Sequence, residues 1–323
     1  MNKFIALLKR EFWENRGALV ITPIAMGGIY IVSSLMGIGI QMRFDNSNYT
    51  LREGIRALAD LDSEFLSFVY YQVQLGPLSG LFTTALAIVV IFYLLGSLYD
   101  DRKNKSILFW KSMPASDRLT MASKLTTAML VAPLLFWIVL VLTHVVLMLI
   151  GSIMIWVVGM SAWDIFLSNL QPFKAWGMIL LMYMAQAIWA LPLYGWLMLV
   201  SSFAPRIPIL FAILPPVIFG FLQWWITFLR TFTFGKRDLF GAIGHWFANS
   251  PVILSINVDE EHLRRDDMFE NGLGIPLFDD FDHAVTVANI FDRLLSTQML
   301  ISLALAAVLL SAAWWLRRRA AEV

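Results

Sequence analysis

Apolar residues in this chain gather in six long stretches that contain no lysine, arginine, aspartate or glutamate. A membrane-spanning helix needs about 20 apolar residues, because each adds about 1.5 Å across a hydrocarbon core of about 30 Å. Each stretch is therefore predicted to be a transmembrane helix. The six stretches are Ala18–Ile40, Leu75–Leu98, Leu125–Val158, Ala175–Phe203, Ile207–Leu229 and Gln298–Leu316.

Two parts of this pattern predict particular geometry. Leu125–Val158 has 34 residues, so it must tilt, kink at Pro133 or extend beyond the bilayer. The fourth and fifth stretches are separated only by residues 204–206, which leaves room for nothing but a tight helical hairpin.

Composition agrees with a membrane protein. Hydrophobic residues make up 59% of the 323 residues and charged residues 15%, where soluble domains carry about a quarter. A net charge of +1 provides no basic surface, so no nucleic-acid partner is expected. The absence of cysteine excludes disulfides and thiolate metal sites. We expect an all-α integral membrane protein with one transmembrane domain over residues 1–323.

Charge distribution predicts the orientation. With the N-terminus in the cytoplasm, 14 of the 24 basic residues fall inside, and 17 of the 23 acidic residues fall outside. Basic residues favour the cytoplasmic side. We therefore expect a multi-pass protein of the cell membrane, of the bacterial cytoplasmic (inner) membrane type, with both termini in the cytoplasm. The first stretch is too long for a signal-peptide core and is expected to be retained.

Two segments are then predicted outside, Gln41–Gln74 and the larger Arg230–Thr297. Whether short re-entrant helices form in the second is left open. Its histidines, His245, His262 and His283, follow no recognised metal-ligand spacing, so no metal site is expected. The chain also contains no phosphate-binding glycine loop and no nucleophile motif, so no cofactor and no enzymatic activity of its own are predicted.

His144 lies within the third stretch, where an ionisable side chain is by default a functional candidate. We prefer the simpler interpretation, in which a neutral histidine forms a hydrogen bond to a neighbouring helix.

The N-terminal segment is predicted to form a short amphipathic helix. Five apolar residues occupy one arc of it, whereas Glu11 intrudes on that arc. Such a helix lies in the headgroup layer with its cations towards anionic lipid. Two interpretations stay open. The helix either only supplies positive charge on the cytoplasmic side, or it is an elbow helix that also contacts a cytoplasmic partner. The apolar residues are Phe4, Ile5, Leu7, Leu8 and Phe12.

The loop between the second and third stretches carries the strongest signal. After a charged exit at residues 100–105, Ser106–Met113 presents four consecutive large apolar residues, which a solvated loop has no reason to expose. Pro114 ends this short helix, and Ser116 is predicted to be the N-cap of the next one, with Asp117 at its positive end.

From Asp101-Arg102 through Ser106–Arg118 to Ser123-Lys124, the loop resembles that of the membrane subunits of type-2 ABC exporters, which have a type V exporter-like fold. The resemblance implies a coupling helix that docks on a separately encoded ATPase, which would bind the ATP and Mg. It implies two such ATPase subunits and a second permease subunit, identical or paralogous. The implied coupling residues are Asp101, Arg102, Ile107, Leu108, Phe109, Trp110, Lys111, Met113, Pro114, Ser116, Arg118 and Lys124.

The resemblance also implies a cargo path lined by the first, second and fifth helices. Aromatic residues and methionine there suit an apolar or amphipathic cargo such as a drug, a lipid or a peptide. Lipid-facing packing explains the same residues. Two other functions stay open: an ATPase-coupled mechanical transducer or sensor acting through Arg230–Thr297, and a polytopic membrane enzyme or scaffold. The candidate path residues are Met26, Phe82, Phe211, Pro215, Phe219 and Gln223.

Overall fold

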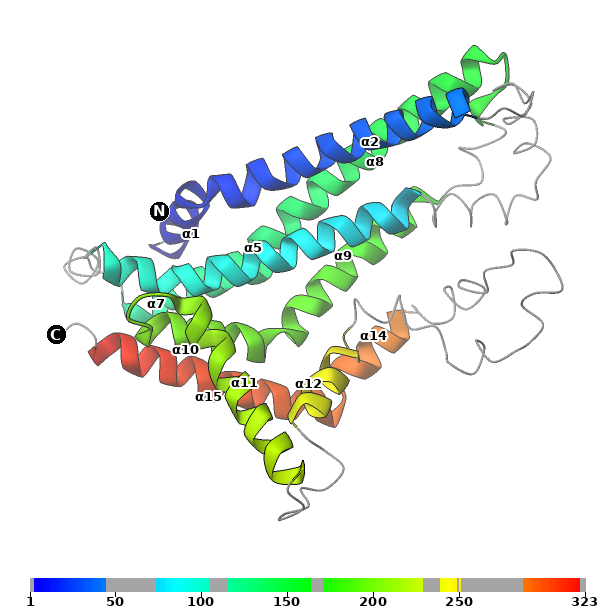
Figure 1. The fold of residues 1–323 in the computed structure, drawn as a ribbon. Coiled ribbons are helices and arrows are strands. Elements are labelled where there is room, and N and C mark those ends of the chain that lie inside the picture. The colour runs from blue at the N-terminus through cyan, green and yellow to red at the C-terminus, as the bar shows by residue number, and fades with distance from the viewer. Residues whose placement is uncertain are drawn as a thin grey trace. The chain divides into compact units, whose positions relative to one another are not determined.

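The computed structural model describes residues 3–44, 74–104, 116–163, 171–228, 239–248, 250 and 287–319. Throughout these ranges every regular element is a helix (Figure 1). In order these are α1 Lys3–Glu14, η1 Gly17–Ile21, α2 Thr22–Phe44, α5 Gly76–Lys103, α7 Asp117–Thr126, η3 Thr127–Val131, α8 Ala132–Val157, α9 Pro172–Trp189, α10 Leu191–Phe203, α11 Pro208–Phe228, α12 Leu239–Ala248, α14 Val287–Leu294 and α15 Thr297–Arg319.

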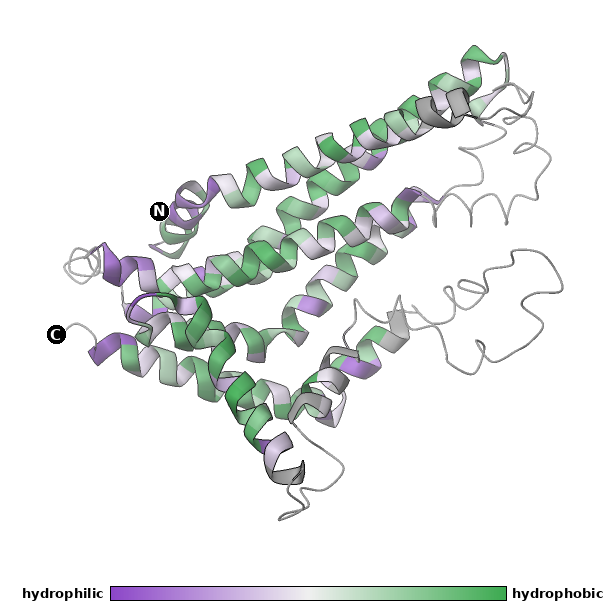
Figure 2. Ribbon diagram, in the orientation of Figure 1, coloured by the Kyte–Doolittle hydropathy of each residue, from purple (hydrophilic) through white to green (hydrophobic). Residues whose placement is uncertain are grey.

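Five of the described helical segments are long and apolar enough to cross a membrane, and a sixth span is possible if α9 and α10 cross as one. Apolar residues cover the long helices. Polar residues gather on the short helix α1 and at the C-terminal end of α15 (Figure 2). The predicted all-α, multi-pass membrane protein is confirmed at this level.

The fourth predicted stretch differs from a plain transmembrane helix. It divides into α9 and α10, which meet at a bend of 53°. Ala190 lies at the break, and Pro192 follows in the first turn of α10. Proline has no backbone N–H and its ring collides with the preceding turn, so a helix cannot pass through it undisturbed. The predicted tight hairpin between the fourth and fifth stretches is confirmed, because α10 ends at Phe203, α11 begins at Pro208, and the two helices contact each other.

The third stretch is part of a helical segment of 41 residues, Asp117–Val157, which includes α7, η3 and α8. At about 1.5 Å per residue this is longer than the bilayer core, and the three options of tilting, kinking at Pro133 and extending beyond the bilayer stay predictions. The π-helical turn η3 ends two residues before Pro133, and η1 likewise ends two residues before Pro23. A widened turn accommodates the proline ring without breaking the helix.

The chain forms two compact units. The first contains Met1–Glu11, Val90–Leu130 and Met182–Val323, and the second contains Phe12–Val89 and Val131–Leu181. In the first unit α10 packs along α15, and α7 and α11 also contact this pair, α7 through α15 and α11 through α10. Gly195 of α10 permits the approach, because a Cβ there would lie 3.1 Å from the Leu309 Cβ and 3.3 Å from the Ala306 carbonyl oxygen.

In the second unit α2 packs against α8. A Cβ at Gly27 would collide with the Thr143 hydroxyl, so this glycine allows the two helices to meet closely. Phe82 and Phe136 form a buried edge-to-face pair with ring centroids 6.4 Å apart.

Candidate functional site: a buried charge cluster

Six charged side chains from four helices meet inside the first unit. Arg10 and Glu11 come from α1, Asp101 from α5, Asp117 and Lys124 from α7, and Arg317 from α15. We call this set the charge cluster. Three members are acidic and three are basic, so their formal charges cancel.

Asp101 is the centre of the cluster. Its Oδ2 lies 3.2 Å from Arg317 Nη1 and 3.7 Å from Lys124 Nζ, and its Oδ1 lies 3.7 Å from Arg10 Nη2. Only 5% of Asp101 is exposed, and Lys124 and Arg317 are each 3% exposed. One carboxylate therefore contacts three cations that come from three other helices.

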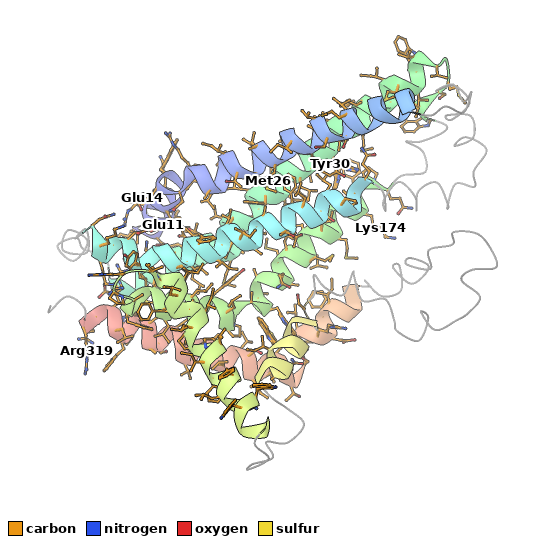
Figure 3. The ribbon with its side chains drawn as sticks, in the orientation of Figure 1. Glu11, Glu14, Met26, Tyr30, Lys174 and Arg319 are labelled. Atoms are coloured by element: carbon orange, nitrogen blue, oxygen red, sulfur yellow. The ribbon has the colours of Figure 1, made fainter. Side chains whose placement is uncertain are left out.

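Glu11 joins the N-terminal helix to the cluster. Its Oε1 lies 3.1 Å from Lys124 Nζ, and its Oε2 accepts a hydrogen bond of 2.8 Å from the Tyr93 hydroxyl. Glu11 lies on α1 (Figure 3). It is 1% exposed, and Leu7, one turn earlier, is also buried. The glutamate that interrupts the apolar arc therefore fixes α1 to α5 and α7.

Asp117 connects the start of α7 with the end of α15, because its Oδ1 lies 3.3 Å from Arg317 Nε. The preceding residue, Ser116, is extended, and its hydroxyl accepts a hydrogen bond from the Leu119 amide at 3.3 Å. The predicted N-cap is confirmed.

The free-energy cost of burying charge makes the members of the cluster dependent on one another. Removing a charge from water is costly, and the cost is offset only when partners and hydrogen bonds remain in place. Deleting one member of a buried pair typically costs about 3–5 kcal/mol, since the other charge is left buried. The cluster therefore holds the ends of α1, α5, α7 and α15 in one arrangement. Loss of one member is expected to weaken the attachment of all four.

Arg102 forms a second connection beside the cluster. Its Nη2 donates to the carbonyl oxygens of Ser201 at 2.9 Å and Ala204 at 2.8 Å. These carbonyls belong to the C-terminal end of α10, where helical acceptors have no partner within their own helix. Arg102 thus fastens the end of α5 to the end of α10.

The predicted coupling residues are only partly described. Residues 105–115 lie outside the described residues, and with them Ile107, Leu108, Phe109, Trp110, Lys111, Met113 and Pro114. Asp101 and Lys124 are buried in the charge cluster, and Arg102 contacts α10. Arg118 is exposed and lies over the Trp314 ring, with its Cζ 4.3 Å from the ring centroid. The coupling role of all these residues stays a prediction.

The predicted cargo-path residues lie in both units. Met26 is half-buried on α2 (Figure 3), while Phe82 is completely buried. On α11, Phe219 is 61% exposed, Phe211 and Pro215 are also exposed, and Gln223 is half-buried. Their assignment to a path stays a prediction.

The simpler interpretation of His144 agrees with the structure. This fully buried histidine accepts a hydrogen bond of 2.8 Å at Nδ1 from Trp176 Nε1 on α9, the neighbouring-helix contact that was expected.

Sequence reasoning did not identify Arg10, Tyr93 and Arg317 as site residues. Tyr93 and Arg317 are separated from Glu11 and Asp101 by 82 and 216 positions, so no local spacing connects them. The usable signal is Glu11, an acid on an apolar arc, which requires a buried cation or donor as its partner.

Among the described residues no group of three or more histidine, aspartate or glutamate side chains could hold a metal ion. Comparisons of the chain with protein-family models, with curated proteins and with solved structures found no match.

Proposed function

We propose that this chain is the transmembrane permease subunit of an ATP-driven ABC exporter, working with a separate ATPase and exporting an apolar or amphipathic cargo. The observation that carries the proposal is where the charge cluster lies. Asp101 and Asp117 stand on either side of the loop that resembles a coupling helix, and both belong to the cluster. A displacement of this loop by a bound ATPase would act on α1, α5, α7 and α15 together.

Six membrane crossings are part of this proposal. Glu11 precedes the first span, Arg317 ends the last, and both reach the same cluster. This supports a layout in which the two ends of the membrane domain share one side, as an even number of crossings gives. Five spans are unbroken, and in this proposal the bent pair α9–α10 provides the sixth.

The contact of Arg102 supports this count independently. The 41-residue segment that begins at Asp117 crosses away from the cluster, and α10 ends at carbonyls held by Arg102, back on the cluster's side. This contact is what we expect if the pair α9–α10 returns across the bilayer. Following the basic residues, we assign the cluster's side to the cytoplasm.

The topology is tested by single cysteines in this cysteine-free chain. Cysteine at Asn104 should react with an impermeant maleimide only after cells are permeabilised, and cysteine at Asn271 should react in intact cells. Labelling of both positions from outside would refute the six-span arrangement.

ATPase coupling is tested at the two aromatic residues of the loop. In Phe109→Ala/Trp110→Ala, an ATPase that copurifies with the wild type should be lost, or its stimulated hydrolysis should fall, because buried interface aromatics contribute about 2–4 kcal/mol each. Phe291→Ala serves as the control, since this side chain is half exposed on α14. Full ATPase binding and stimulation by the double variant would refute the docking role.

A second candidate function is an ATPase-coupled mechanical transducer, and one contact favours it. Trp246 of α12, within the segment predicted outside, stacks on Trp189 at the α9–α10 break with centroids 6.2 Å apart. The Trp189 indole also donates to the Trp246 carbonyl at 3.2 Å, so this segment is attached to the bend. Hydrolysis stimulated by a cargo would favour export, and hydrolysis stimulated only by an external protein would favour the transducer.

A further inference from the structure

Two arginine side chains lie over tryptophan rings where α7 begins and α15 ends. The Arg118 Cζ lies 4.3 Å from the centroid of the Trp314 ring, and the Arg319 Cζ lies 3.8 Å from the centroid of the Trp315 ring. Both arginines are exposed, as is Arg318 between them on the surface of α15, and Trp315 is 48% exposed. We call these five residues the basic patch.

The charge cluster fixes the two helix ends that carry the basic patch. Arg317 Nε lies 3.3 Å from Asp117 Oδ1, and Arg317 Nη1 lies 3.2 Å from Asp101 Oδ2. Arg317 is only 3% exposed, so it belongs to the interior. Because Asp117 and Arg317 directly precede Arg118 and Arg318, the buried ion pair brings the two ends of the patch together. Contacts between α7 and α15 agree with this placement.

The basic patch carries uncompensated positive charge. Asp117, the acid beside it, is already bound by the buried Arg317. Among the described residues, neither Arg118 nor Arg319 forms an ion pair with a carboxylate. An indole ring attracts a guanidinium placed over its face, and the guanidinium keeps planar N–H donors that match the oxygens of a phosphate. The patch is therefore complementary to a phosphate-bearing anion.

The place of the patch along the helices identifies the source of that anion. Apolar residues of α15, a candidate membrane span, continue to Leu316, and Arg319 lies beyond them at the C-terminal end (Figure 3). Another candidate span, Asp117–Val157, begins with α7. Tryptophan is enriched at the level of the lipid headgroups, and basic residues at the ends of spans attract anionic lipid. We therefore expect the patch to meet lipid phosphates.

We infer that the basic patch binds the headgroup of an anionic phospholipid. Arg118 and Arg319 donate to its phosphate oxygens, and the exposed face of Trp315 contacts the glycerol and the upper acyl chain. The bound lipid then joins α7 to α15 at the surface, above the ion pair that joins them inside. This inference goes beyond the proposed function, because it requires only that the chain spans a membrane.

The test is lipid binding by the full chain in detergent, measured by native mass spectrometry. Phosphatidylglycerol is compared with phosphatidylcholine of the same acyl chains, whose headgroup carries no net charge. The wild type should bind phosphatidylglycerol more tightly. Arg118→Gln and Arg319→Gln should each weaken that binding about fivefold, the change that about 1 kcal/mol per basic residue gives, and should leave phosphatidylcholine binding unchanged. Unchanged binding of phosphatidylglycerol in both variants overturns the inference.

Arg16→Gln is the matched control, because this exposed arginine directly precedes the first candidate span, Gly17–Gly37. Its affinity for phosphatidylglycerol should stay within about twofold of the wild type, since one charge outside the site contributes only weak, screened attraction. An equal loss in Arg16→Gln and Arg118→Gln would mean general attraction by surface charge and would overturn a specific site. Trp315→Leu keeps an apolar side chain but removes the ring under Arg319, and it should weaken phosphatidylglycerol binding as well.

Two further outcomes separate a lipid from other anions. Inorganic phosphate should displace phosphatidylglycerol no better than chloride at the same ionic strength, because it lacks acyl chains. Stronger displacement by inorganic phosphate would mean a site for a soluble anion and would overturn the inference. Loss of a copurifying ATPase from the arginine variants, with phosphatidylglycerol binding intact, would mean a protein contact and would overturn it too.

Discussion

Two consecutive helices, α10 and α11, are both strongly apolar and yet differ completely in how they are packed. Eight residues of α10 are buried, among them Gly195, Ser201 and Ser202. Along α11 the large side chains are exposed, with Phe219 61% exposed and Trp224 56% exposed. Lipid chains are as apolar as these side chains, so apolarity alone does not bring membrane helices together. Small and hydroxyl-bearing residues allow close packing, as Gly195 of α10 does against α15 and Ser201 of α10 does against α5.

The charge cluster continues the packed region of α10 and α15, and its loss is expected to have the largest effect. Lys124→Met leaves Glu11 and Asp101 without one of their buried cations, which should destabilise the protein by about 3–5 kcal/mol. Thermal unfolding in detergent measures the change. Lys103→Met, at an exposed lysine of α5, should have little effect on stability. Equal losses of stability in the two variants would show that the cluster contributes no more than an exposed charge.

Close packing at Gly195 should have the next largest effect. In Gly195→Leu a side chain must fit where a Cβ already lies 3.1 Å from Leu309, and overpacking of this kind costs about 1–3 kcal/mol. Gly28→Leu is the control, because a Cβ there meets nothing within 4 Å among the described residues. A wild-type melting temperature for Gly195→Leu would show that α10 is not closely packed at this position, and the difference in packing between α10 and α11 would no longer hold there.

One hydrogen bond joins the two helices and should contribute less. Pro216 has no N–H for the Ala212 carbonyl, and the Trp196 indole donates to that carbonyl at 3.1 Å. Trp196→Phe should cost about 1 kcal/mol, the usual net contribution of a hydrogen bond. Trp156→Phe, at a 75% exposed tryptophan, should change the unfolding temperature much less. Indistinguishable variants would mean that the indole bond contributes nothing.

The smallest loss of stability is expected at the exposed side chains of α11. Phe219→Ala should change stability by no more than about 0.5 kcal/mol, as for other exposed positions. The same substitution at the buried Phe136 should cost about 3–5 kcal/mol. If Phe219 belongs to the proposed cargo path, its variant should instead alter cargo-stimulated hydrolysis. A large loss of stability at Phe219 would indicate that a partner covers this face.

Much of the fold was predictable, because charge-free apolar stretches of this length have few alternatives to membrane helices. The hairpin at residues 204–206 and the Ser116 cap followed from local rules. The break at Ala190 was not predicted, since Pro192 lies within an unbroken apolar run and periodicity does not mark it. The charge cluster could not be assembled from sequence, because Arg317 and Asp101 meet across 216 positions.

The balance of charges in the cluster also limits how this sequence can change over generations. Asp101 is shared by three cations, and Glu11 by Lys124 and Tyr93, so few members can be replaced without affecting another. A lineage that alters one of them passes through a protein that carries an unmatched buried charge. Divergent descendants should therefore keep all six residues or exchange them in compensating pairs, even where the surrounding apolar helices have become unrecognisable.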